Sequence, residues 1–141
     1  MTSIKGIVFS CFDLLHAGHI TMLEECKEKC DYLIAGLHTN PAHKEDLVQS
    51  VYERYVQLKG CKYVDEIIPY SSEEEIKDIL LTLPLDVRFL GEEYMLAIPT
   101  ITGYNICIER KIHIHYCKRK HHYSSSELKE RIVSLSDTIK N

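Results

Sequence analysis

The sequence of 141 residues contains no apolar run of the length that crosses a membrane, no internal repeat and no low-complexity tract. A membrane-spanning helix needs roughly 20 consecutive apolar residues. The apolar residues that follow Met1 are interrupted by Lys5, Ser10 and Asp13, so we expect neither a signal peptide nor a membrane span. These absences predict a soluble protein of the cytoplasm.

The six cysteines also lack a CxxC pair and the spacing of a disulfide framework. Cys26 and Cys30 lie four residues apart on a predicted helix, and His113 and His115 alternate along a predicted strand, which would permit a metal site. Free cysteines and strand histidines more often serve packing. We therefore expect reduced thiols and no metal held by protein ligands.

Neither sign of charge dominates, because the chain has 17 basic and 21 acidic residues, which give a net charge of −4. This mild acidity argues against a nucleic-acid partner, although residues 118–122 form a short basic cluster, KRKHH. With 45% apolar residues the chain is long enough to bury one core, and we expect a single domain over residues 1–141.

Apolar periodicity predicts an alternation of strands and helices. The predicted strands lie at residues 4–9, 32–37, 64–70, 86–90 and 112–117, with Pro69 expected to stop the third. The predicted helices lie at residues 18–29, 50–59, 71–81 and 124–135, with a loop and a further helix between 92 and 110.

Strands that alternate with helices form right-handed βαβ units, so we predict an α/β fold with one doubly wound, five-stranded parallel sheet. In such sheets ligands bind beyond the carboxyl ends of the strands, where the strand order reverses. That edge would bring together His16, the loop at 38–46, Gly91 and residues 118–126.

Two histidines flank a glycine at the predicted start of the first helix, in the stretch His16-Ala17-Gly18-His19. A helix start presents unpaired backbone N–H groups and the positive end of the helix dipole, which favours an anion. Two imidazoles three residues apart would lie on one side of the first turn and donate hydrogen bonds to phosphate oxygens. A single histidine here would more simply pair with the backbone.

Three consecutive hydroxyls, Ser124, Ser125 and Ser126, precede Glu127 at the predicted start of the last helix. This is a capping-box pattern, in which Ser124 accepts a hydrogen bond from the Glu127 backbone. With Arg119 before it, the segment also suits a pyrophosphate. Two anion-binding helix starts at opposite ends of the chain suggest one polyphosphate held between them.

These motifs resemble the cytidylyltransferase branch of the HxGH nucleotidyltransferases. The resemblance begins at FDLLHAGHITMLEECKEKCDYLIAGL and continues in order through YERY, KYVDEIIPY, FLGEEY and YSSSELKERI. It implies a Rossmann-like nucleotidyltransferase fold, Mg²⁺ bound with the triphosphate, and a homodimer. The implied reaction transfers CMP from CTP to a small phosphorylated polyol, with glycerol 3-phosphate favoured, and releases pyrophosphate.

The resemblance also assigns roles to individual residues. His16 and His19 would stabilise charge at the α-phosphate, and Arg119 would hold the triphosphate or ribose. The implied nucleotide-binding residues are Ser10, Cys11, Phe12, His16, Gly18, His19, Gly91, Arg119, Tyr123, Ser124, Ser125 and Ser126. Lys44, Arg54 and Lys77 would bind the acceptor, Lys44 also neutralising phosphate charge in catalysis, although a charge pair on a helix surface explains Arg54 and Lys77 equally well.

The chain departs from the family pattern at Ser10, where glycine is usual, at Ala17, where tryptophan is frequent, and at Lys120-His121-His122, where the family has Thr-Glu-Gly. These positions concern the base and the acceptor more than the phosphate machinery. An ATP-using adenylyltransferase acting on FMN, a sugar phosphate or phosphopantetheine is therefore an alternative. A non-catalytic nucleotide-binding regulator of the same fold is another.

Overall fold

The computed structural model describes residues 3–41, 47–119 and 121–140. Its centre is a sheet of five parallel strands in the order β3-β2-β1-β4-β5. The order reverses between β1 and β4, as in a doubly wound sheet, so the predicted fold class is confirmed. The strands are β1 (Lys5–Ser10), β2 (Tyr32–His38), β3 (Glu66–Tyr70), β4 (Val87–Gly91) and β5 (His113–Cys117).

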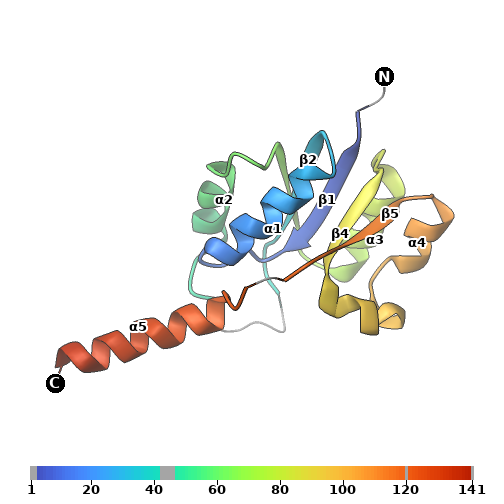
Figure 1. Cartoon of the computed structure of the whole chain (residues 1–141). Helices are drawn as coiled ribbons and strands as arrows, with labels where there is room; N and C mark the ends of the chain where they lie inside the picture. Colours follow the sequence, from blue (N-terminus) through green and yellow to red (C-terminus); the bar gives the residue numbers. More distant parts are fainter. Residues whose placement is uncertain (1–2, 42–46, 120, 141) are drawn as a thin grey trace.

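Helices cover both faces of this sheet (Figure 1). On one face, α1 (Ala17–Glu28) and α2 (Val51–Lys59) bury Leu23, Cys26 and Leu58 against the strands. On the other face, α3 (Glu73–Thr82) and α4 (Tyr104–Glu109) bury Ile76, Leu80 and Cys107. The strands supply apolar residues to both cores, which explains why their sequences read as continuous apolar runs.

The third strand differs from the prediction. Pro69 does not stop β3 but lies within it, in register with Leu37 of β2. Since β3 is an edge strand, one side of its backbone pairs with no other strand, and a residue without an N–H group is tolerated there. Between β4 and α4 the chain forms two short 3₁₀ helices, η1 (Glu92–Leu96) and η2 (Ile98–Thr100), where a loop was expected.

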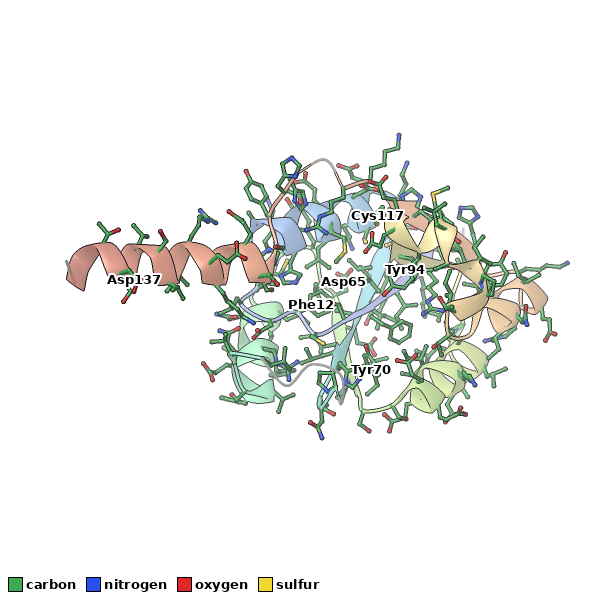
Figure 2. The ribbon with its side chains drawn as sticks, turned by 90° about the horizontal axis from the view of Figure 1, so that it is seen from below. Phe12, Asp65, Tyr70, Tyr94, Cys117 and Asp137 are labelled. Carbon is green, nitrogen blue, oxygen red and sulfur yellow. The ribbon has the colours of Figure 1, made fainter. Side chains whose placement is uncertain are left out.

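The last helix, α5 (Ser125–Lys140), is longer than predicted and extends away from the body of the molecule (Figures 1 and 2). Only its first turns lie beside the sheet edge, where Ser125 Oγ donates a hydrogen bond to the Asp13 carbonyl oxygen. Within the described ranges, no helix combines the length and the apolar character needed to span a bilayer.

Candidate active site

The turn between β1 and α1 has a strained backbone. Phe12 and Leu14 both have positive φ values, of 52° and 61°, a region that side chains other than glycine rarely occupy. Such strain costs about 1–3 kcal/mol per residue and persists only where the surroundings enforce it. Here the buried Asp13 carboxylate accepts hydrogen bonds from the backbone N–H groups of Val48 and Gln49, both at 3.0 Å.

Arg54 holds the same turn from beneath. Its side chain is 2% exposed and donates to four backbone carbonyl oxygens. The shortest of these bonds reach His38 at 2.6 Å and Cys11 at 2.9 Å. The sequence predicted that Arg54 contacts an acceptor substrate or forms a charge pair on a helix surface. The structure corrects both predictions, because the buried guanidinium is bonded to backbone carbonyl groups instead.

His16 and His19 form a reciprocal cap at the start of α1. Nδ1 of His16 accepts from the Gly18 N–H at 3.0 Å, and Nδ1 of His19 accepts from the His16 N–H at 3.2 Å. The two rings stack, with centroids 3.9 Å apart. The helix begins one residue earlier than predicted, because His16 itself is the N-cap.

This arrangement fixes the tautomer of both rings. Because each Nδ1 accepts a hydrogen bond, each neutral imidazole carries its proton on Nε2. Burial lowers the pKa of His16 below its usual value, and the neighbouring His121 and Arg119 lower it further. The lowered pKa favours the neutral ring of His16, which presents an N–H donor rather than a cation.

Gly18 is required by the packing of imidazole rings around it. A Cβ atom at this position would lie 2.9 Å from Cε1 of His16 and 3.0 Å from Cε1 of His121. His121 also stacks on Tyr123, with centroids 5.0 Å apart, and its Nδ1 accepts from the Tyr123 N–H. The segment before α5 thus packs directly against the histidine motif, a contact the sequence did not reveal.

The serine-rich start of α5 behaves as its capping pattern predicts. Ser124 Oγ accepts from the Glu127 N–H at 3.1 Å. Arg119 is exposed, and its Nη2 donates to the Tyr123 carbonyl oxygen at 3.0 Å. That bond links the chain just after β5 to the chain just before α5.

A cavity of about 930 Å³ lies at the carboxyl ends of β4 and β5 and extends along α1 as far as Lys29. The start of α1 and the start of α5 both line it. The cavity brings together nine of the residues predicted from the sequence, namely His16, Gly18, His19, Gly91, Arg119, Tyr123, Ser124, Ser125 and Ser126.

The other predicted residues lie elsewhere. The described residues that line the cavity do not include Ser10, Cys11 or Phe12. Phe12 is fully buried and packs on the ring of His19, so its side chain supports the motif instead of contacting a nucleotide. Lys77 lies on α3, where its ammonium group pairs with Glu74 at 3.0 Å. Lys44 lies outside the described residues.

Sequence reasoning missed two contributors. Asp13 is a buried acid three residues after the end of β1, and that position was a usable signal for a structural role. Glu93 gave no such signal, yet its carboxylate lies over Gly91 in the cavity and occupies the space that a Cβ atom would need.

Comparisons with known proteins show the family of the chain. The family model described as cytidylyltransferase-like matches residues 7–131. Glycerol-3-phosphate cytidylyltransferase of Bacillus subtilis (strain 168) is 30% identical over 134 residues, which cover 93% of this chain and 98% of that protein. Ethanolamine-phosphate cytidylyltransferase of Dictyostelium discoideum is 31% identical over 145 residues, which cover 98% of this chain and 39% of that protein.

Solved structures share the fold at lower sequence identity. The lipopolysaccharide core biosynthesis protein from Thermoplasma volcanium GSS1 superimposes with a TM-score of 0.64 and 20% identity, covering 86% of this chain and 100% of that chain. A putative nicotinate-nucleotide adenylyltransferase from Vibrio parahaemolyticus gives a TM-score of 0.59 at 14% identity, covering 94% of this chain and 88% of that chain.

Proposed function

Because the chain belongs to the cytidylyltransferase-like family and is a nucleotidyltransferase, we propose that it transfers CMP from CTP to a small phosphorylated polyol, with glycerol 3-phosphate as the leading acceptor. The products would be a CDP-alcohol and pyrophosphate. The observation that carries the proposal is the histidine pair at the start of α1, which faces one cavity with Arg119 and the serines of α5.

The proposed chemistry needs no covalent enzyme intermediate. A phosphate oxygen of the acceptor would attack the α-phosphorus of CTP while the bond from that phosphorus to the β-phosphate oxygen breaks. Negative charge would build on the α-phosphate oxygens, where the Nε2–H groups of His16 and His19 would donate hydrogen bonds. Arg119 and the start of α5 would hold the departing pyrophosphate.

Mg²⁺ is part of the proposal as a partner of the triphosphate. Carboxylate oxygens such as those of Glu93 line the cavity and suit a hard cation, which usually keeps several waters and binds few protein groups. Bound there, Mg²⁺ would neutralise phosphate charge. Glu93 would orient it from beside Gly91.

A turnover assay tests the proposal. Pyrophosphate release is measured with CTP or ATP, each paired with glycerol 3-phosphate, ethanolamine phosphate, FMN, a sugar phosphate or phosphopantetheine. We expect the fastest release with CTP and glycerol 3-phosphate. Faster release with an ATP pair would instead identify an adenylyltransferase.

A binding measurement separates an enzyme from a regulator. A nucleotide at 100 times its dissociation constant stabilises the fold by about 2.7 kcal/mol, which raises the melting temperature of a domain of this size by roughly 10 °C. A shift with CTP and Mg²⁺, but no pyrophosphate release with any acceptor, would contradict the enzyme and favour the nucleotide-binding regulator.

A homodimer is also part of the proposal. Its support is α5, which projects from the body of the molecule and leaves Ile132 and Leu135 55% and 64% exposed (Figure 1). Apolar side chains on an extended helix are commonly covered by a partner. A second copy of the chain is the partner that the family resemblance implies.

A further inference from the structure

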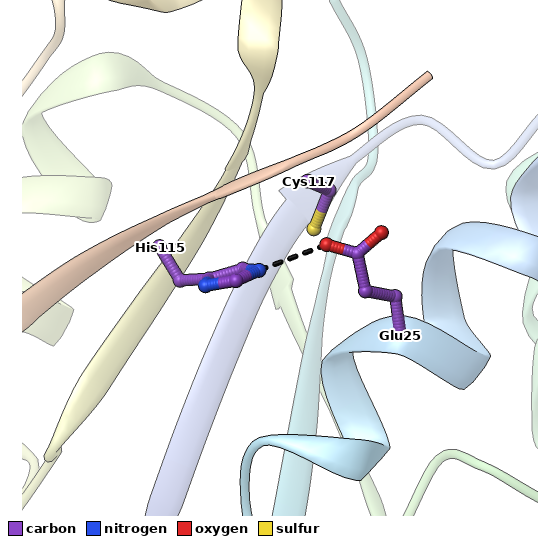
Figure 3. A group of neighbouring side chains, drawn as sticks. All are labelled: Glu25, His115 and Cys117. Atoms are coloured by element: carbon purple, nitrogen blue, oxygen red, sulfur yellow. Dashed lines mark hydrogen bonds and ion pairs between the residues drawn. The ribbon is translucent and has the colours of Figure 1, made fainter. Parts of the chain in front are cut away.

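We propose that Glu25, His115 and Cys117 bind a zinc ion in the wall of the cavity. Glu25 lies on α1, and the other two residues occupy alternate positions of β5, so their side chains point to the same face of the sheet (Figure 3). His115 Nε2 lies 2.8 Å from Glu25 Oε2, and one ligand atom from each of the three residues lies within 4.8 Å of the others.

The spacing suits a tetrahedral ion. Zinc bonds of about 2.0–2.3 Å place neighbouring ligand atoms roughly 3.3–3.8 Å apart. The distances between the ligand atoms of Glu25, His115 and Cys117 differ somewhat from these values. Small side-chain rotations would bring the three atoms to the separation that zinc requires. Three protein ligands with a fourth position open to a cavity is a common arrangement for zinc.

The chemistry of the donors favours zinc over magnesium. A thiolate and an imidazole are soft or borderline ligands that suit zinc, whereas Mg²⁺ prefers an all-oxygen shell. The ion pair between Glu25 and His115 occupies those two side chains, and the buried Cys117 sulfur lies beside them while it packs against Cys26 in the core. On binding, zinc would displace the proton of the Cys117 thiol, and that proton would pass to solvent.

Burial shields one ligand of the proposed site from solvent and leaves the other two accessible from the cavity. Cys117 is 4% exposed, and its sulfur lies 3.7 Å from that of Cys26, which is buried in the core. Glu25 and His115 are partly exposed, and all three proposed ligands line the cavity. An ion could therefore enter from the cavity while its sulfur ligand stays shielded from solvent.

The charges around the cluster also favour a cation. Carboxylates outnumber cationic side chains in the cavity wall: Glu24, Glu25, Glu28 and Glu93 face Lys29, Lys118 and Arg119. A divalent ion at Glu25 would offset the crowding of acidic groups along α1. It would also tie α1, which carries the histidine motif, to β5.

Metal binding by the whole chain tests the proposal without any assay of turnover. Protein free of an affinity tag is stripped with a chelator, kept under a non-thiol reductant and dialysed against zinc in excess Mg²⁺. We expect elemental analysis to find one zinc per chain. With Co²⁺ as a probe we expect thiolate-to-cobalt absorption in the near ultraviolet.

Two pairs of matched variants locate the site. Loss of a second-shell group already costs about 10–100-fold in metal affinity, so Cys117→Ala and His115→Ala should weaken zinc binding by more than about 100-fold. Cys30→Ala, just after α1, and His113→Ala, two residues before His115 on β5, remove the same chemical groups nearby and should keep full affinity. Zinc should raise the melting temperature of the wild type and of both controls only.

Two results would overturn the proposal. One is a Co²⁺ complex of the wild type without thiolate absorption, which needs no variant to fold. The other is equal loss of zinc in His113→Ala and His115→Ala, which would mean binding by scattered surface histidines. If Cys117→Ala is unfolded, Glu25→Gln takes its place and must weaken zinc binding in the same way.

Discussion

His16 and His19 each use one ring nitrogen for folding, which leaves the other nitrogen for the chemistry that we propose. Their Nδ1 atoms cap α1, and their Nε2 atoms carry the donated N–H groups. Replacing either by alanine removes both roles at once. A lost cap alone costs about 1 kcal/mol of stability, which would blur the interpretation of a loss of activity.

Asparagine separates the two roles. Its side-chain oxygen can accept the capping hydrogen bond in place of Nδ1, but no donor replaces Nε2. We expect His16→Asn and His19→Asn to keep their thermal stability and to lose about 10²–10³-fold in kcat, as for other lost oxyanion donors. Pyrophosphate release under saturating substrates measures this loss.

His113→Asn is the matched control, since this residue is exposed on β5 and does not line the cavity. Its turnover should equal that of the wild type. Turnover within a few-fold of wild type in a folded His16→Asn protein would rule out the transition-state role assigned to that residue.

At the scale of elements, one helix residue connects three separate segments. Arg54 of α2 donates to carbonyl groups at the end of β1, at the end of β2 and in the segment before α2. It thereby holds the strained turn at Phe12 and Leu14 in place. The position of the histidine motif therefore depends on this buried guanidinium together with the Asp13 carboxylate.

Arg54→Met should therefore destabilise the fold strongly. Buried acceptors that lose their partner cost about 1–3 kcal/mol each, so we expect a loss of at least about 3 kcal/mol in the free energy of unfolding. Urea denaturation measures it. Lys77→Met, which removes a partly exposed cation of α3 paired with Glu74, should change stability by less than about 0.5 kcal/mol.

The same pair of variants tests the acceptor roles predicted from the sequence. Contact between an acceptor and Lys77 would raise the acceptor KM of Lys77→Met without a loss of stability. We expect no such rise. A stable Arg54→Met protein with a raised acceptor KM would contradict the structural role given to Arg54.

At the scale of the whole molecule, α5 carries an apolar stripe that the packing of the rest of the fold does not explain. Leu128, Ile132 and Leu135 recur at helical spacing and form one stripe along it. In the first turns of the helix, Lys129 lies 3.9 Å from Asp13, and the rest of the helix projects from the body of the molecule. This stripe is the surface through which we propose that two chains associate.

A double substitution tests this surface. Ile132→Glu with Leu135→Glu places two like charges in the stripe, and we expect light scattering to show a shift from dimer to monomer. Ser134→Glu, on the same helix but outside the stripe, should leave the mass unchanged. A wild-type protein that is monomeric at micromolar concentration would contradict the dimer.

Local signals in the sequence predicted most of the fold. Strand and helix alternation gave the parallel sheet, and the Ser124 cap was predicted to the residue. Errors occurred where context outweighs local preference. Pro69 is tolerated because β3 lies at an edge, and the two 3₁₀ helices occupy a segment whose proline and glycine obscure any periodicity.

The sequence by itself determined the family, the fold class and the histidine pair, because each depends on residues close together in the chain. Only the tertiary structure decided the partners of side chains far apart in sequence. It committed Arg54 to carbonyl groups, brought His121 against Gly18, and joined Glu25 to His115 across 90 residues. Such contacts depend on strand order and helix placement, which no local pattern encodes.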